Sequence, residues 1–156
     1  MGSKDSKKNQ KSGPATIQNR KASFEYHFED TVEAGIVLVG SEVKSLFLGR
    51  ANLTDAYCQV KAGELFLFNL DIEPYEFSAA FPHERRRARK LLMHRNEIDQ
   101  LQRKSEQKGL ALVPYKIYFK DGKAKVAVAL ARGKKTYDKR ESIKERDEKR
   151  DLERNG

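Results

Sequence analysis

The sequence predicts a mainly β protein: a closed or nearly closed antiparallel β-barrel of about six strands, with two or three short flanking helices and a disordered basic C-terminal tail. Three observations support this fold class. A strand, a short helix and a second strand follow one another within 35–57. Two pairs of strands surround glycine-containing turns at 61–64 and 121–122. A helical pattern over 94–108 lies between those pairs.

The first 18 residues are predicted to form a disordered basic arm. They are mostly Ser, Lys, Gly, Asn and Gln, and such a composition buries too little apolar surface to offset the cost of ordering the chain. A strand is expected over 23–28, where aromatic and polar residues alternate. The length leaves room for one domain with a modest core, which is predicted to span residues 19–132.

The segment 35–57 supplies the first well-defined elements. Ile36 to Val39 is an apolar, β-branched run of strand length. Ser41 is predicted to cap a helix of two turns over 42–48, and Gly49 suits the residue that follows its end. A short helix between two strands is typical of a small barrel with one end plugged.

A hairpin is predicted from 57–60 and 65–70. Residues 65–68 are apolar at every position, which favours burial on both sides of the strand. The alternative interpretation is that Phe66 and Phe68 are stacking platforms for nucleic-acid bases.

The C-terminal half continues the barrel. Ile98 and Leu101 give the helix over 94–108 a narrow apolar stripe. Asp121-Gly122 is a strong hairpin signal between strands 112–120 and 123–131, which leaves Lys125 on the outer face of the sheet. The strand total favours a barrel of the oligonucleotide-binding kind.

Charge indicates a polyanionic partner. The formal net charge is +9, and 35% of the residues are charged while 38% are hydrophobic. Six basic residues lie between Arg85 and Arg95 with no acid among them; such a run is usually solvated, although an RNA backbone would relieve its self-repulsion. A single cysteine, no long apolar run and no secretory signal together predict a cytoplasmic protein.

Residues 133–156 are predicted to be a tail that is disordered when free and helical on a partner. Residues 134–156 hold nine basic and seven acidic side chains and few large apolar ones. This composition supports a helix only when a partner surface stabilises it.

Several words of the sequence are specific enough to indicate a family. They are Gly40-Ser41-Glu42-Val43-Lys44-Ser45-Leu46, Gly49-Arg50-Ala51-Asn52-Leu53, Arg87-Ala88-Arg89-Lys90-Leu91-Leu92, Gly133-Lys134-Lys135 and Asp138-Lys139-Arg140. Together they resemble the SmpB family of bacterial SsrA-binding proteins along nearly the whole chain. The resemblance implies an oligonucleotide-binding-type barrel that binds the tRNA-like domain of transfer-messenger RNA and delivers it to stalled ribosomes. Phe47 stands where the family usually has a basic residue.

The resemblance and the basic run together predict the binding residues. Asn19, Glu33, Leu92 and Lys125 match RNA-binding positions of the family, although Leu92 fits a core leucine equally well. The predicted RNA-binding set is Asn19, Arg20, Lys21, Glu33, Lys44, Arg50, Asn52, Arg87, Arg89, Lys90, Leu92 and Lys125. The predicted ribosome-binding tail set is Gly133, Lys134, Lys135, Tyr137, Asp138, Lys139, Arg140, Ile143, Lys144 and Arg146. No catalytic residue, metal ligand or cofactor is predicted.

By the same resemblance the partners are transfer-messenger RNA and the decoding centre and messenger channel of the small ribosomal subunit. Alanyl-tRNA synthetase and elongation factor Tu are implied indirectly, through the RNA. A monomer without membrane contact is expected. The alternatives are a generic RNA-binding protein for single-stranded or structured RNA and, less favoured, an RNA hydrolase, since the three histidines show no metal-site spacing.

Overall fold

The computed structural model describes residues 13–75 and 83–134, which form nine strands and three helices. In chain order they are β1 (Ile17–Gln18), α2 (Arg20–Glu25), β2 (Tyr26–Ile36), α3 (Gly40–Phe47), β3 (Ala51–Asn52), β4 (Tyr57–Lys61), β5 (Glu64–Phe68), β6 (Asp71–Ile72), β7 (Arg89–Leu92), α4 (Arg95–Lys108), β8 (Ala111–Lys120) and β9 (Lys123–Gly133). The predicted mainly β class is confirmed.

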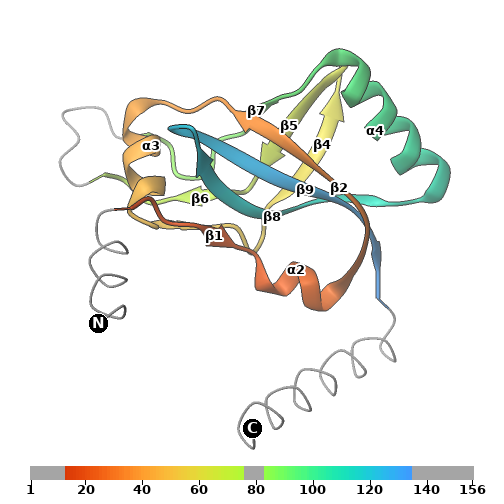
Figure 1. Ribbon diagram of the computed structural model, residues 1–156, viewed down its shortest axis with the longest axis horizontal. Helices are drawn as coiled ribbons and strands as arrows, with labels where there is room; N and C mark the ends of the chain where they lie inside the picture. Colours follow the sequence, from red (N-terminus) through yellow and green to blue (C-terminus); the bar gives the residue numbers. More distant parts are fainter. Residues whose placement is uncertain (1–12, 76–82, 135–156) are drawn as a thin grey trace, which may run out of the picture.

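Seven strands form one antiparallel sheet in the order β1-β8-β9-β2-β7-β5-β4, and β3 pairs with β6 in a separate small sheet. Figure 1 shows α3 and α4 at opposite ends of the large sheet and α2 beside the start of β2. The long strands β2, β8 and β9 therefore form the rigid middle of the molecule, between two ends closed by helices.

Closure of the barrel is not confirmed, because the edge strands β1 and β4 pair with no further strand within 13–75 and 83–134. β1 stops after two residues, since the chain turns away from β8 into α2. The first residues of β8 therefore stay unpaired on that side and face the edge of β4 across a pocket of about 580 Å³. The seven-stranded sheet is therefore open at this seam.

One core fills the inner face of the sheet. Leu65 and Leu67 of β5 and Val126 and Val128 of β9 are fully buried there. Ile98 and Leu101 of α4 cover the core, as the helical stripe predicts. A smaller cluster lies under α2, where Ala22 packs on Val113, Ala129 and Ala131.

The N-terminal expectations need correction. The predicted arm is too long by at least two residues, because Ile17 and Gln18 pair with β8 and Ile17 is buried. The strand expected over 23–28 begins only at Tyr26, since a helical turn capped by Asn19 comes first. Residues 1–12 lie outside the described part of the chain.

The elements around α3 also differ from expectation. β2 ends at Ile36, and Val39 is half-exposed rather than part of a strand. The helix begins at Gly40, where the Glu42 carboxylate accepts a hydrogen bond of 2.9 Å from the Val39 amide. Ser41 does not cap this helix; its hydroxyl bonds the His83 ring at 2.9 Å.

The two turn predictions and the long helix are confirmed. Asp121 and Gly122 both have positive φ, 53° and 75°, as the tight β8–β9 hairpin requires. Helix α4 starts one residue later than predicted and ends at Gly109, whose φ of 64° is the left-handed cap.

Candidate nucleic-acid interface

The outer face of β2, β8 and β9 carries a cluster of charged and aromatic side chains. Ile117 and Val126 point into the core, so their neighbours Tyr118 and Lys125 point outward, where their backbones pair across the hairpin. The Tyr118 hydroxyl donates a hydrogen bond to the Glu33 carboxylate on β2. Lys120 Nζ lies 3.7 Å from the other carboxylate oxygen. We call Glu33, Tyr118, Lys120 and Lys125 the Glu33 cluster.

The surroundings of Glu33 keep it ionised. The hydrogen bond from Tyr118 is the largest effect, and it outweighs partial desolvation; with Lys120 and Lys125 it holds the pKa of the Glu33 carboxyl below its usual value. Burial and the bond to Glu33 raise the pKa of Tyr118 to about 12, so its hydroxyl remains a donor. The cluster thus presents a fixed anionic acceptor among cations.

Such an arrangement suits structured nucleic acid. Lysines attract phosphate oxygens, whereas a carboxylate can accept only from N–H or O–H donors on bases and riboses. Lys116 adds a further cation, with Nζ 5.2 Å from the centre of the Tyr118 ring. Tyr118 and Lys120 were missed by sequence reasoning, although the Asp121-Gly122 turn fixes the register that pairs Tyr118 with Lys125.

Leu92 extends this face with apolar surface. It is 53% exposed, so it is no core leucine. On β7 it pairs with Gly35 of β2, and a Cβ built at Gly35 would lie 3.3 Å from the Leu92 Cβ. Lys90, two residues earlier on the same side of β7, is exposed and lies 3.4 Å from Glu64. Glu33, Lys125, Leu92 and Lys90 therefore share one continuous sheet face.

Two arginines of the basic run point inward instead. Arg89 and Glu42 both have no exposed side-chain surface, and Arg89 Nε donates to the Glu42 carboxylate at 2.7 Å. Arg87 donates to the same carboxylate at 2.6 Å and is only partly exposed. Burial acts to raise the pKa of Glu42, but the bonds from Arg87, the Val39 amide and Arg89 outweigh it, so the pKa lies below its usual value.

Burial and these bonds give Arg89 a structural role, and the RNA contact of Arg89 stays a prediction. Its remaining N–H groups donate to backbone carbonyls, at 2.6 Å to that of Leu70 and at 3.1 Å to those of Arg85 and Arg87. A guanidinium fully enclosed by acceptors joins α3 to the segment before β7 and has no surface to offer a phosphate. The sequence shows the run of charge but not the buried acid that one of its members pairs with.

Asn19 also has a structural role. It is 5% exposed, its side-chain oxygen accepts from the Ala22 amide, and its Nδ2 donates at 3.2 Å to the carbonyls of Leu53 and Pro114. This set of bonds ties α2, β8 and the segment after β3 together. The Asn19 Nδ2 group thus spends its donors inside the domain, and the RNA contact of Asn19 stays a prediction.

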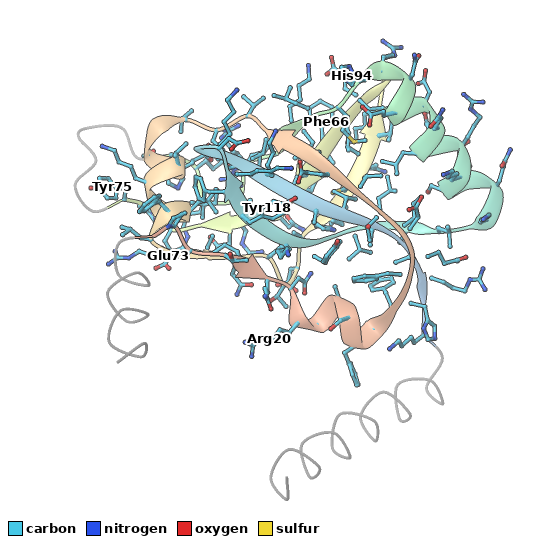
Figure 2. All side chains as sticks on the ribbon, viewed as in Figure 1. Arg20, Phe66, Glu73, Tyr75, His94 and Tyr118 are labelled. Carbon is cyan, nitrogen blue, oxygen red and sulfur yellow. The ribbon has the colours of Figure 1, made fainter. Side chains whose placement is uncertain are left out.

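The remaining predicted residues are exposed but lie elsewhere. Arg20 and Lys21 are on α2, where Arg20 points away from the sheet (Figure 2). Lys44 is on α3, with Nζ 5.2 Å from the centre of the Tyr75 ring. Arg50 and Asn52 follow that helix and are exposed. These residues do not join the Glu33 cluster.

The first tail residues are fixed to the body of the domain. Gly133 ends β9, and the Lys134 amide donates to the Glu25 carbonyl at 2.8 Å. Lys134 Nζ donates to the Ser23 carbonyl at 3.2 Å. The predicted tail residues Lys135, Tyr137, Asp138, Lys139, Arg140, Ile143, Lys144 and Arg146 lie outside the described residues.

Phe47 packs against the sheet rather than lying free. Its ring centre is 5.8 Å from that of Phe119, in an edge-on arrangement.

In residues 13–75 and 83–134, no group of three or more His, Cys, Asp or Glu side chains could hold a metal ion. No described helix is both long and apolar enough to cross a membrane. Burial raises the pKa of the Cys58 thiol, which disfavours the reactive thiolate.

Comparisons with known proteins all match this chain to one family. The family model described as SmpB protein matches residues 16–156. The SsrA-binding protein of Syntrophomonas wolfei is 54% identical over 138 residues, 88% of each chain. That of Thermobifida fusca is 54% identical over 143 residues, covering 91% of this chain and 89% of the relative.

A solved structure is similar as well. It is described as "tmRNA-SmpB: a journey to the center of the bacterial ribosome", and it superposes with a TM-score of 0.66 at 49% identity. The match covers 78% of this chain and 85% of the other. The two chains are therefore similar in sequence as well as in fold.

Proposed function

Because this chain belongs to the SmpB family, we propose that it is the RNA-binding adaptor of trans-translation, which binds transfer-messenger RNA and acts with it on stalled ribosomes. The family match over residues 16–156 and the SsrA-binding relatives support this function. The solved relative, whose description places SmpB with transfer-messenger RNA and the ribosome, supports both partners. An adaptor contributes binding and positioning, and needs no catalytic residue.

The observation that carries the proposal is the Glu33 cluster beside an exposed leucine. Lys120 and Lys125 supply cations on this face that can neutralise phosphates of a folded RNA. Glu33, held by Tyr118, selects donor groups on bases or riboses, and Leu92 offers an apolar contact. This combination favours the tRNA-like domain over arbitrary RNA, because phosphate contacts alone carry no shape or sequence information.

The tail supplies the second half of the proposed function. Lys134 donates hydrogen bonds to the Glu25 and Ser23 carbonyls of α2, so the end of β9 is held at a defined point of the domain. From that point the tail becomes helical against ribosomal RNA in the messenger channel and decoding centre. Alanyl-tRNA synthetase and elongation factor Tu act through the bound RNA, and the protein works as a cytoplasmic monomer.

The test compares Glu33→Gln with Glu29→Gln, a matched control on the same strand whose carboxylate pairs with Arg132 at 3.0 Å. Binding of the tRNA-like domain and of an unstructured RNA of equal length is measured by filter retention at two salt concentrations. Glu33→Gln should weaken the first complex more than the second, and Glu29→Gln should affect neither. Equal losses on both RNAs, or cleavage of the RNA in the presence of divalent metal, would contradict the adaptor proposal.

A further inference from the structure

Three aromatic rings follow one another on the outer face of β4 and β5. The ring centres of Tyr57 and Phe68 lie 5.3 Å apart, with planes 24° from parallel, and that of Phe66 lies 6.3 Å from Phe68. Leu65 and Leu67 occupy the inner face, so these rings point away from the core. The expectation of burial on both sides of 65–68 is wrong, because the core covers only one face. We call Tyr57, Phe66 and Phe68 the aromatic ladder.

The ladder is accessible. Tyr57 is 46% exposed, and Phe66 and Phe68 are partly exposed. Figure 2 shows Phe66 on β5, on the part of the sheet toward α4. Cross-strand packing of Tyr57 on Phe68 supports the hairpin, but that role needs no third ring and no exposed ring faces. A row of partly exposed rings on a basic protein suits a partner whose flat aromatic groups can stack on them.

Charge identifies that partner. Lys61 Nζ lies 4.8 Å from the centre of the Phe68 ring, and Lys90 pairs directly opposite Phe66 on β7. Gln59, exposed and opposite Phe66 on β4, brings an amide that can both donate and accept. Glu64, the acid on the same side of β5, pairs with Lys90 at 3.4 Å. Rings flanked by cations fit a polyanion with aromatic bases better than an apolar peptide or a neutral surface.

The ladder is also continuous with the face already described. Phe66 neighbours Lys90 across the β5–β7 pair, and Leu92 follows Lys90 on the same side of β7. From Leu92 the face passes through Gly35 to Lys125. An RNA held at the Glu33 cluster could therefore run on across Leu92 and Lys90 to the rings.

We propose that the aromatic ladder is a second RNA contact of this protein, a stacking platform for unpaired nucleotides that adjoin the folded domain held at the Glu33 cluster. The proposal rests on the proposed function for its RNA. It adds a class of ligand, single-stranded nucleotides recognised by stacking rather than by backbone shape. Because every base has a π-face, the platform should tolerate sequence.

The test uses the fact that the chain contains no tryptophan. Tyr57→Trp in the full chain places a single tryptophan, whose fluorescence can be excited selectively, in the ladder and keeps an aromatic ring there. The control is Phe47→Trp, a comparably exposed ring on α3. The probe is an oligoadenylate of about ten nucleotides, a length within the site size of related single-strand binders. Stacking predicts quenching at position 57 and little change at position 47.

Affinity gives the second measurement. Tyr57→Leu combined with Phe66→Leu keeps apolar bulk but removes two ring faces, and it should weaken oligoadenylate binding about fivefold or more for each lost stack. Glu33→Gln should lower binding of the tRNA-like domain more than binding of oligoadenylate, whereas loss of the two rings should lower binding of oligoadenylate, so the two proposals fail separately.

Three outcomes would overturn the ladder proposal. One is equal quenching at positions 57 and 47. Another is unchanged oligoadenylate affinity in the Tyr57→Leu/Phe66→Leu protein with a normal melting curve. The third is quenching at position 57 by anionic lipid vesicles or by an acidic peptide but not by RNA. If the double variant unfolds, the quenching experiment still decides, because Tyr57→Trp preserves the ring.

Discussion

Replacing Arg89 by alanine should destabilise the fold more than any other charge removal in the basic run. The Arg89 guanidinium is fully buried, and its loss leaves the Glu42 carboxylate, also fully buried, with Arg87 as its one cationic partner among the described residues. It also removes the donors to the carbonyls of Leu70 and Arg85. A buried acceptor without a donor destabilises the folded state, because it loses its hydrogen bonds to water and gains none within the protein.

The magnitude follows from these contacts. Breaking a buried ion pair by removing one partner costs about 3–5 kcal/mol. For a domain of this size each kcal/mol lowers the melting temperature by about 3–5 °C, so the expected fall is roughly 10–25 °C. Such a loss is a large share of the total stability of about 5–15 kcal/mol typical of small domains.

The matched control is Arg86→Ala, three residues earlier in the same run. The Arg86 side chain is half-exposed and lies 3.9 Å from Asp71, so its loss should cost less than about 1 kcal/mol. The measurement is thermal unfolding followed by far-UV circular dichroism for both variants and the parent. Comparable melting temperatures for Arg89→Ala and Arg86→Ala would refute the structural role of Arg89.

A pair replacement separates charge from packing. Glu42→Met with Arg89→Met removes both buried charges and keeps similar volume, which is often neutral for ion pairs inside proteins. Here recovery should be partial, since Arg87 and the carbonyls that Arg89 served lose their partners. A double variant less stable than Arg89→Ala would contradict this account.

Three further predictions follow from the same contacts. Tyr118→Phe removes the hydrogen bond to Glu33, so it should weaken binding of the tRNA-like domain while leaving the melting temperature unchanged. Combined with Glu33→Gln, it should cause no further loss of affinity. Full additivity of the two losses would argue against Tyr118 acting through Glu33. Hydrogen bonding and charge from Arg85 hold the pKa of Asp71 below its usual value. The stability that Asp71 contributes is therefore present above the ordinary carboxyl pKa of about 4 and is lost as pH falls through the lowered folded-state pKa. The difference in melting temperature between the parent and Asp71→Asn should shrink below about pH 4, and a constant difference would contradict this prediction. Truncation after Lys134 removes eight basic and seven acidic side chains, a net charge of only +1. The melting temperature and the RNA affinity should therefore stay close to those of the parent protein, while tagging on a message without a stop codon should be lost. Normal tagging by the truncated protein would show that the domain alone suffices.

Local chemistry was sufficient to predict the turns, the long helix and the mainly β class. Asp121-Gly122 can adopt the positive φ angles of a tight hairpin wherever it lies, and Gly109 ends α4 for the same local reason. The family words around Gly40 and Gly133 indicated the family correctly, because such words are specific without any structure. These properties depend on residues close together in the chain.

Only the tertiary structure decided which side chains of those elements face outward. Arg89 and Lys90 are adjacent in one basic run, yet Arg89 is buried because Glu42, 47 residues earlier, lies beneath it, while Lys90 points to solvent. The apolar run 65–68 likewise contains two buried leucines and two partly exposed rings, because α4 and the facing strands cover a single side of β5. Burial is set by partners distant in sequence, and no local pattern records which of two faces those partners will cover.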